Sequence, residues 1–406
     1  MNSSKSLGIR WLILAVGVVT MLFAGIIYAW SIIKSPFAGL GFEAEDLAFN
    51  FTLTMSFFCI GGLLSTQLVK LLGVRLTIIL SGVLAGAGFV LSSLLGEGQT
   101  VLLYLTYALM AGLGIGIVYI TIISSVNAWF PDRKGLSSGA LMMGFGASSL
   151  VLGNLADSLF KSDFGWRNTY ILLGILLAVV LCLSAIFIKR PDSSVTLPEP
   201  KKLKGKGAEN FEIKDMKPTE MIRRFTFWRA FVFLICVTAV GSSVISFSKD
   251  FILSFDGEKA ALATTMVGVF AICNGLGRII TGAVFDALGR RFTMLAASLL
   301  TVLAAGITLL SAVIGSLPLA IVGICLIGMS YGTSPTVASA FTASFYGNKH
   351  FASNLGVMNF NLMCASFTAT LCANILKATG GFVAPFILLV SLAAVSFALN
   401  FTIRKP

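Results

Sequence analysis

A single arginine lies inside a long apolar stretch in the second half of the chain. Arg278 follows Asn274 by four residues within the segment 271–286. A charge near the centre of a bilayer costs roughly 2.5–3.5 kcal/mol on insertion scales, so it normally faces a water-filled cavity or a partner. The planar guanidinium can hold a carboxylate through two parallel hydrogen bonds. Arg278 is therefore the first candidate for binding an anion, and pairing with a neighbouring helix is the alternative.

Three tyrosines could complete such a site, because phenolic hydroxyls can donate to carboxylate oxygens. Counted from the starts of their apolar runs, Tyr119, Arg278 and Tyr331 lie about 19, 18 and 15 residues deep, which is within roughly 6 Å in depth for helices. Asn274 shares a helix face with Arg278, and Tyr28 approaches from the outer part of the first run. We predict a site of these five residues; anchoring at the membrane surface is the alternative for the tyrosines.

The composition indicates that these residues lie in a lipid bilayer. Of 406 residues, 57% are hydrophobic and 11% are charged, against roughly 25% charged in soluble domains, and the mean hydropathy is +0.94. Runs of about 20 apolar residues are long enough to cross a bilayer as helices, and they lack the short alternating pattern of a barrel. We predict an all-α membrane protein with twelve spans, near residues 11–33, 47–70, 74–95, 101–126, 134–157, 167–188, 227–252, 261–283, 292–313, 317–340, 352–376 and 381–403.

The net charge of +12 is distributed in a way that predicts topology. Basic residues collect on one side of the alternating spans, which the positive-inside rule assigns to the cytoplasm together with both termini. The opposite loops are acidic, so Glu97 and Lys259 should face outward. We expect a multi-pass protein of the inner (plasma) membrane that contacts lipid and binds no nucleic acid. The basic groups are Lys5 with Arg10, Lys70 with Arg75, Arg133 with Lys134, residues 189–224, Arg290 with Arg291, Lys349, and Arg404 with Lys405.

A basic, proline-containing segment at residues 191–224 divides the chain into halves, 1–190 and 225–406, with six spans each. We interpret it as a cytoplasmic linker with a short surface helix near residues 216–224. The loop after the second span of the second half, at residues 282–291, has a counterpart with matching spacing at residues 67–75 in the first half. This match indicates an internal repeat.

The second-half loop, Gly-Ala-Val-Phe-Asp-Ala-Leu-Gly-Arg-Arg, closely resembles the G-x-x-x-D-x-x-G-R-R/K signature of the major facilitator superfamily. The resemblance implies a fold of two six-helix halves and a gating role for Asp286, Gly289, Arg290 and Arg291. The first-half copy departs from the signature, because Lys70 stands near the expected acid.

Residues 127–139, Asn-Ala-Trp-Phe-Pro-Asp-Arg-Lys-Gly-Leu-Ser-Ser-Gly, resemble the oxalate/formate antiporter family, relatives of the monocarboxylate transporters. The resemblance extends to Tyr-Ala-Trp at 28–30, to 116–119, to 274–278 and to 330–332. It implies secondary transport of small carboxylates by alternating access, with the five predicted residues binding substrate. Further residues expected to line the cavity are Trp30, Phe145, Asn359 and Asn361.

The oxalate-transporting members of that family have a lysine in the eleventh helix, whereas residues 356–363 of this chain contain none. Lys377 lies at the outer end of that run. A monocarboxylate such as formate, lactate or pyruvate is therefore the expected substrate, and exchange of oxalate or another dicarboxylate for formate is the alternative. The coupling mode is either anion exchange or proton symport. Asp250 is the candidate proton carrier, with a solvated helix end as the alternative interpretation.

The sequence lacks the residues that other classes of function require. The seven cysteines show no metal-ligand spacing, there is one histidine (His350), and there is no phosphate-binding loop, so we expect no metal, no cofactor and no enzymatic activity. Glycine pairs such as Gly144 and Gly146 predict close helix contacts. A non-transporting membrane receptor remains the alternative from another class. We expect the transporter to act as a monomer.

Overall fold

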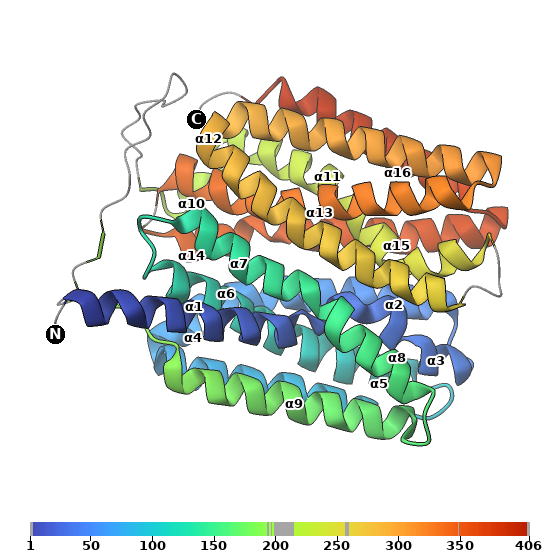
Figure 1. Cartoon of the computed structure of the whole chain (residues 1–406), viewed down its shortest axis with the longest axis horizontal. Helices are drawn as coiled ribbons and strands as arrows, with labels where there is room; N and C mark the ends of the chain where they lie inside the picture. The colour runs from blue at the N-terminus through green and yellow to red at the C-terminus, as the bar shows by residue number, and fades with distance from the viewer. Residues whose placement is uncertain are drawn as a thin grey trace.

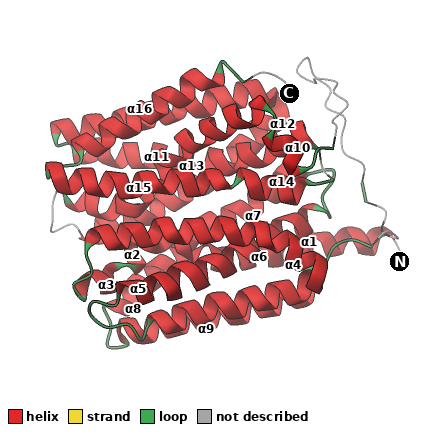
Figure 2. Cartoon of the chain, turned by 180° about the vertical axis from the view of Figure 1, so that it is seen from behind, coloured by secondary structure: helices red, strands yellow, loops and turns green. Residues whose placement is uncertain are grey.

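The computed structural model is a bundle of long helices that lie side by side (Figure 1). It describes residues 3–192, 195, 197–198, 215–255, 260–347 and 349–403, and within this part every regular element is a helix (Figure 2). The elements are α1 (Ser3–Ala24), η1 (Gly25–Ala29), α2 (Trp30–Ile33), α3 (Ser35–Gly39), α4 (Ala44–Ser92), α5 (Thr100–Leu103), η2 (Tyr104–Ala111), α6 (Gly112–Asn127), α7 (Lys134–Ser148), η3 (Ser149–Gly153), α8 (Asn154–Phe160), α9 (Gly165–Phe187), α10 (Pro218–Ile222), α11 (Phe225–Leu253), α12 (Ala260–Ile314), α13 (Leu317–Tyr346), α14 (Phe351–Met358), α15 (Phe360–Thr379) and α16 (Val383–Asn400).

The prediction of twelve spans is confirmed. Eleven helical segments among the described residues are long and apolar enough to cross a membrane, and one of them, α4, contains two spans in its 49 residues. Gly73 separates these two with φ 78° and ψ 170°, and Gly289 separates the two spans of α12 with φ 76° and ψ 178°. Only glycine adopts such a conformation without strain, so each long helix turns back at a glycine.

The internal repeat extends to individual helix contacts. Three glycines of the first half lie so close to a neighbouring helix that an added Cβ would press on a backbone carbonyl, and three glycines at the same spacing in the second half do the same. Small residues of this kind let membrane helices approach closely. The matched contacts are Gly112 on Thr54 with Gly328 on Phe270, Gly116 on Phe58 with Gly332 on Asn274, and Gly61 on Leu113 with Gly277 on Met329.

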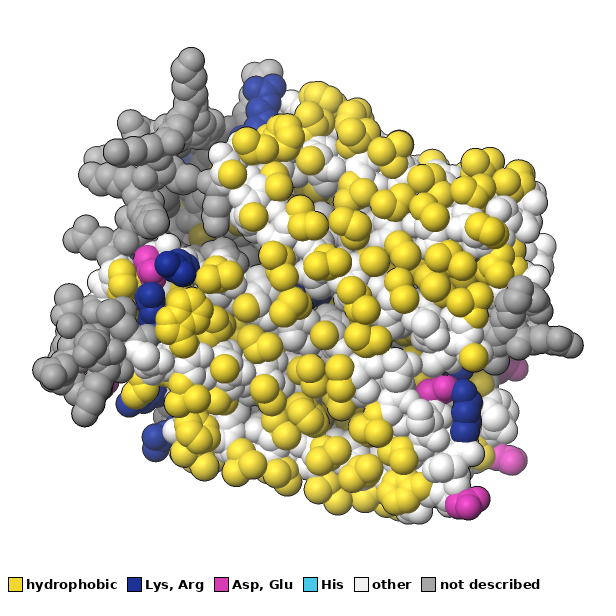
Figure 3. All heavy atoms as spheres, in the orientation of Figure 1, with side chains coloured by type: hydrophobic (Ala, Val, Ile, Leu, Met, Phe, Trp, Pro, Cys, Tyr) yellow, Lys and Arg dark blue, Asp and Glu magenta, His cyan; other side chains and the backbone are white. Residues whose placement is uncertain are grey.

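The bundle has two ends of different charge. Both chain termini lie at one end, called here the terminal end (Figure 1), and the loop after α1–α3 lies at the other, called the distal end. Hydrophobic side chains cover the face seen in Figure 3 between the two ends, where the charged side chains gather. Large apolar side chains such as Val83, Leu303 and Ile387 are more than half exposed on the surface of the bundle, as a lipid-facing surface requires.

The short helix predicted within residues 216–224 is α10, and it packs at the terminal end. The backbone nitrogen of Met216 donates to the carbonyl of Tyr346 (3.1 Å), and the amide of Asn354 donates to the carbonyl of Met216 (2.9 Å). Met221 is fully buried. The end of the predicted linker is therefore attached to α13 and α14; most of its earlier part lies outside the described residues.

The helices before and after this segment are called here the N-terminal half (α1–α9) and the C-terminal half (α11–α16). They meet along two main lines of contact, and α11 also touches α2. Along the first, α4 packs on α14 and α15: Thr52 donates to the carbonyl of Ser366 (3.0 Å), and the Cys59 thiol donates to the carbonyl of Asn359 (3.0 Å). Asn359 separates α14 from α15. Along the second line, α7 packs on the first part of α12, which contains Arg278.

Candidate anion-binding site

Arg278 lies at the contact between the two halves. Its side chain is 1% exposed, its Nε donates to Oδ1 of Asn274 (3.0 Å), and its Nη1 donates to the carbonyl of Met142 on α7. It forms no ion pair, and its Nη2 no hydrogen bond, with any residue that the structure describes. The guanidinium thus touches the N-terminal half while its positive charge has no acidic partner in the described part of the chain.

Two glycines make room for the guanidinium and for the asparagine beside it. At Gly146 on α7, an added Cβ would lie 3.7 Å from Cζ of Arg278 and 3.7 Å from Nδ2 of Asn274. At Gly332 on α13, it would overlap the carbonyl of Asn274 and lie 3.0 Å from the backbone nitrogen of Arg278. The site is therefore enclosed by α7 on one side and by the backbone of α13 on the other.

This packing gives a stability prediction. Gly332→Ala should destabilise the protein by about 1–3 kcal/mol, because α13 and α12 must move apart to admit the methyl group. A thermal unfolding assay in detergent should show a lowered midpoint. Gly306→Ala is the matched control within α12, because an added Cβ there meets nothing within 4 Å. Equal midpoints for both variants would contradict the close packing behind Arg278.

Asn274 has a hydrogen-bond donor that finds no acceptor in the described structure. Its Oδ1 accepts from Arg278, whereas its Nδ2 is buried without a partner. A buried donor left unsatisfied costs about 1–3 kcal/mol. The donor lies beside Gly146 and the guanidinium, so an anion bound to Arg278 is placed to accept from it.

The three predicted tyrosines meet near the arginine. The hydroxyl groups of Tyr331 and Tyr28 lie 3.2 Å apart. The ring of Phe145 on α7 stands edge-on to both Tyr28 (5.0 Å between centroids) and Tyr119 (5.1 Å). Tyr119 and Tyr331 are also close enough to Arg278 to interact with it electrostatically. The structure thus brings all five predicted binding residues, and Phe145, into one region.

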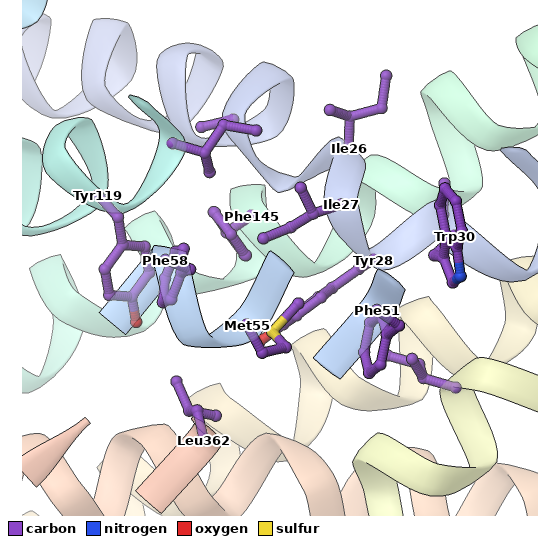
Figure 4. Packing of buried hydrophobic residues seen from close by; sticks show 14 of the residues in the cluster. Ile26, Ile27, Tyr28, Trp30, Phe51, Met55, Phe58, Tyr119, Phe145 and Leu362 are labelled. Atoms are coloured by element: carbon purple, nitrogen blue, oxygen red, sulfur yellow. The ribbon is translucent and has the colours of Figure 1, made fainter. Parts of the chain in front are cut away.

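The other predicted cavity residues make contacts outside this region, although Trp30 also lines a separate cavity at the distal end. Trp30 donates to the carbonyl of Leu47 (3.0 Å) and packs on Tyr107 (4.6 Å between centroids), and Figure 4 shows it apart from Tyr119 and Phe145. The Asn361 amide donates to Met358 (2.6 Å) and accepts from Thr238 (3.0 Å). The carbonyl of Asn359 accepts the hydrogen bond from Cys59 described above. Trp30 and Asn361 thus join helices through their side chains and Asn359 through its backbone carbonyl, whereas Phe145 remains part of the site region.

Several residues near the site carry no clear signal in the sequence. Phe58 and Met55 on α4, and Leu362 on α15, belong to the same buried cluster as the tyrosines (Figure 4). Met142 contributes only its backbone carbonyl, which any residue could supply. Gly146 was predicted to form a helix contact; Gly144 does so, because a Cβ added there would lie 2.5 Å from the carbonyl oxygen of Val18, whereas Gly146 faces Arg278.

Asp250 and the predicted gating loop lie away from this region. Asp250 lies at the distal end, where it pairs with Lys34 (3.1 Å) beside a cavity that Arg278 does not line; its role in proton coupling stays a prediction. At the terminal end, Gly289 forms the turn and Arg290 lies over the ring of Phe345 (4.9 Å). Arg291 is exposed, and the side chain of Asp286 lies outside the described part.

Comparisons with known proteins agree with this architecture. A family model described as Major Facilitator Superfamily matches residues 12–370 and 260–406. The chain is 25% identical over 350 residues to the uncharacterized MFS-type transporter YhjX of Escherichia coli (strain K12), covering 86% of this chain and 84% of that protein. It is 27% identical over 300 residues to the oxalate:formate antiporter of Oxalobacter formigenes, covering 72% and 67%.

A shorter match is to monocarboxylate transporter 6 of Mus musculus, 34% identical over 142 residues and covering 35% of this chain and 29% of that protein. The family model spans nearly the whole chain, and its match agrees with the twelve spans and with the repeat of helix contacts. The chain therefore belongs to the major facilitator superfamily of membrane transporters.

Proposed function

We propose that this transporter carries small carboxylates, most of all monocarboxylates, by alternating access. The observation that carries the proposal is Arg278: a fully buried guanidinium at the contact between the halves, without an acidic partner among the described residues. Such a charge is expensive to keep in a membrane. A carboxylate is the ligand that matches its charge and its planar geometry.

Each half supplies part of the proposed site. Arg278, Asn274 and Tyr331 come from α12 and α13, and Tyr28 and Tyr119 come from η1 and α6. A carboxylate bound to the guanidinium accepts from Nη2 of Arg278 and Nδ2 of Asn274, and the tyrosine hydroxyls are its further donors. Because the anion touches both halves, its binding favours the state in which they close around it, as alternating access requires.

The surroundings of the site favour one carboxylate over two. Among the described residues, the buried cations are Arg278 and Arg10, and Arg10 pairs with Asp132 (2.8 Å) near the terminal end. On α15, the apolar Leu362 belongs to the same buried cluster as the tyrosines. A second buried carboxylate would therefore lose its hydration without gaining an ion pair.

Competition for uptake tests this preference. Lactate, pyruvate or formate should inhibit the uptake of a labelled monocarboxylate at lower concentrations than oxalate or malonate. The measurement is the half-inhibitory concentration of each anion in proteoliposomes. Stronger inhibition by oxalate than by every monocarboxylate would instead favour dicarboxylate/formate exchange, the second candidate, which the name of the Oxalobacter formigenes relative supports. Anion binding without any flux would indicate a receptor.

The proposal includes an orientation in the plasma membrane. Basic residues such as Arg75, Arg133 and Arg291 lie at the terminal end, so we propose that this end is cytoplasmic. A cysteine at Glu97 should react with an impermeant maleimide added to intact cells, whereas one at Arg223 should react only after the cells are opened. The reverse pattern would invert the orientation without changing the site.

A further inference from the structure

The distal end contains a cavity of about 310 Å³ between the two halves. The N-terminal half contributes Trp30, Lys34 and Ala48 to its wall, and the C-terminal half contributes Ser246 and Asp250. The carboxylate site proposed above lies deeper in the bundle, and neither Arg278 nor Asn274 lines this cavity. The cavity is thus a candidate for the outer approach to the site.

Ion pairs connect the halves at three places at the distal end, and two of these connections, those of Lys34 and Lys377, line this cavity. Each joins a lysine of one half to an acidic residue of the other. Lys34 of the N-terminal half also donates to the carbonyl of Ser246 (3.2 Å). The three connections are Lys34 with Asp250 (3.1 Å), Lys249 with Asp157 (3.6 Å), and Lys377 with Glu45 (3.0 Å) and Glu43 (3.8 Å).

The remaining ion pairs among the described residues stay within one half. Arg10 and Arg133 both pair with Asp132 at the terminal end, and Lys161 pairs with Asp157 four residues earlier on α8 (2.5 Å). The ion pairs between the halves described above lie at the distal end. The pairs at the distal end do not stabilise the packing within either half, because each joins one half to the other. The surfaces that they join must separate when the transporter opens outward.

We propose that these three connections form a distal gate, defined by Lys34, Asp157, Lys249, Asp250 and Lys377 with its two glutamates, which holds the outer mouth closed. The contributions of the pairs follow their burial. The side chains of Lys249 and Asp157 are 17% and 11% exposed, whereas those of Lys377 and Glu43 are 64% and 72% exposed. Exposed pairs contribute little and shielded pairs more, so Lys249 with Asp157 is the main connection and Lys34 with Asp250 the second.

The gate gives Asp250 a role that differs from proton transfer to the substrate site. Its carboxylate lies opposite Lys34, and both line the distal cavity. Opening of the mouth separates them and hydrates both charges. The gate rests on the alternating-access part of the proposed function, but it involves no substrate, so it can be tested without knowing which anion is carried.

Accessibility of Ser246 measures the opening of the gate directly. Its side chain is buried in the cavity wall, and Ser246→Cys preserves its size and the carbonyl that accepts from Lys34. The assay is the rate of reaction with an impermeant maleimide in proteoliposomes, corrected for the rate of the same protein without Ser246→Cys. The full-length chain is used throughout, with no substrate added.

Lys249→Gln and Lys34→Gln should each raise the labelling rate of the cysteine at 246 at least about fivefold, because each leaves a carboxylate without its partner in the other half. Lys161→Gln is the matched control: it removes a partner of the same Asp157 but breaks no connection between the halves, so the rate should stay within about 1.5-fold. The double exchange Lys34→Asp with Asp250→Lys should return the rate to within about twofold of the starting protein.

Salt provides a second measurement that does not depend on the folding of a variant. Raising the ionic strength from 0.05 to 1 M should accelerate labelling in the starting protein, since salt screens partly exposed pairs, and should do so less in Lys249→Gln. Unchanged labelling in both Lys249→Gln and Lys34→Gln, or equal acceleration by Lys161→Gln, would overturn the distal gate. That result would leave the carboxylate site at Arg278 untouched.

Discussion

Uptake of a labelled monocarboxylate should fall to background when Arg278 is replaced by glutamine. Removing one member of a buried, hydrogen-bonded charge pair costs about 2–5 kcal/mol, and about 4 kcal/mol already weakens binding by nearly three orders of magnitude. Lysine keeps the charge but cannot offer two parallel hydrogen bonds. Arg278→Lys should therefore retain some transport at a higher substrate concentration. Initial uptake rates over a range of concentrations separate the two variants.

Arg229→Gln is the matched control for this experiment. Like Arg278, Arg229 donates to a backbone carbonyl, that of Thr402 (2.9 Å), but it does so at the exposed terminal end. Its replacement should leave uptake near the wild-type rate. If Arg229→Gln lost transport as completely as Arg278→Gln, the loss would reflect general damage by arginine removal. The proposal that Arg278 has a specific role in transport would then be wrong.

The second large effect concerns the empty transporter. In the absence of an anion, Arg278 must be enclosed with its charge uncompensated, which costs several kcal/mol in a low-dielectric interior. A bound carboxylate makes the pair nearly neutral and easier to enclose. Exchange of external for internal substrate should therefore exceed net uptake into empty vesicles at least about tenfold, the factor that 1.4 kcal/mol produces.

Proton coupling predicts a different outcome in the same vesicles. If Asp250 or another acid compensated Arg278 in the empty state, net uptake would be comparable to exchange and would accelerate with an imposed proton gradient. The pairing of Asp250 with Lys34 at the distal end favours exchange. Vesicles with and without internal substrate, each at two pH gradients, distinguish the modes.

The elements of the fold were predictable because the bilayer imposes one requirement on every span. About 20 apolar residues must form a helix that satisfies its own backbone, and this requirement can be read from hydropathy alone. The turns at Gly73 and Gly289 have a sequence signal of their own, because a positive φ favours glycine. The break at Asn359, within a continuous apolar run, left no comparable signal.

The meeting of the predicted residues in one region was foreseeable from their depth, but their partners were not. Tyr119, Arg278 and Tyr331 lie at similar depths because rise per residue is constant in helices. The contact of Arg278 with the carbonyl of Met142 depends on how two halves pack, and a backbone carbonyl has no sequence signature. The same limit applies to Lys34 and Asp250, which are 216 positions apart in the sequence.

Binding of a monocarboxylate to the purified protein tests the central claim most directly, because it requires neither a direction of flux nor a coupling mode. Formate, lactate and pyruvate are added separately to wild type, Arg278→Gln and Arg229→Gln, and the thermal unfolding midpoint is measured against anion concentration. A ligand stabilises the state to which it binds. We predict a saturable rise in the midpoint for at least one of these anions in wild type and in Arg229→Gln, and none in Arg278→Gln. An equal rise in Arg278→Gln would contradict the proposal that Arg278 binds the carboxylate.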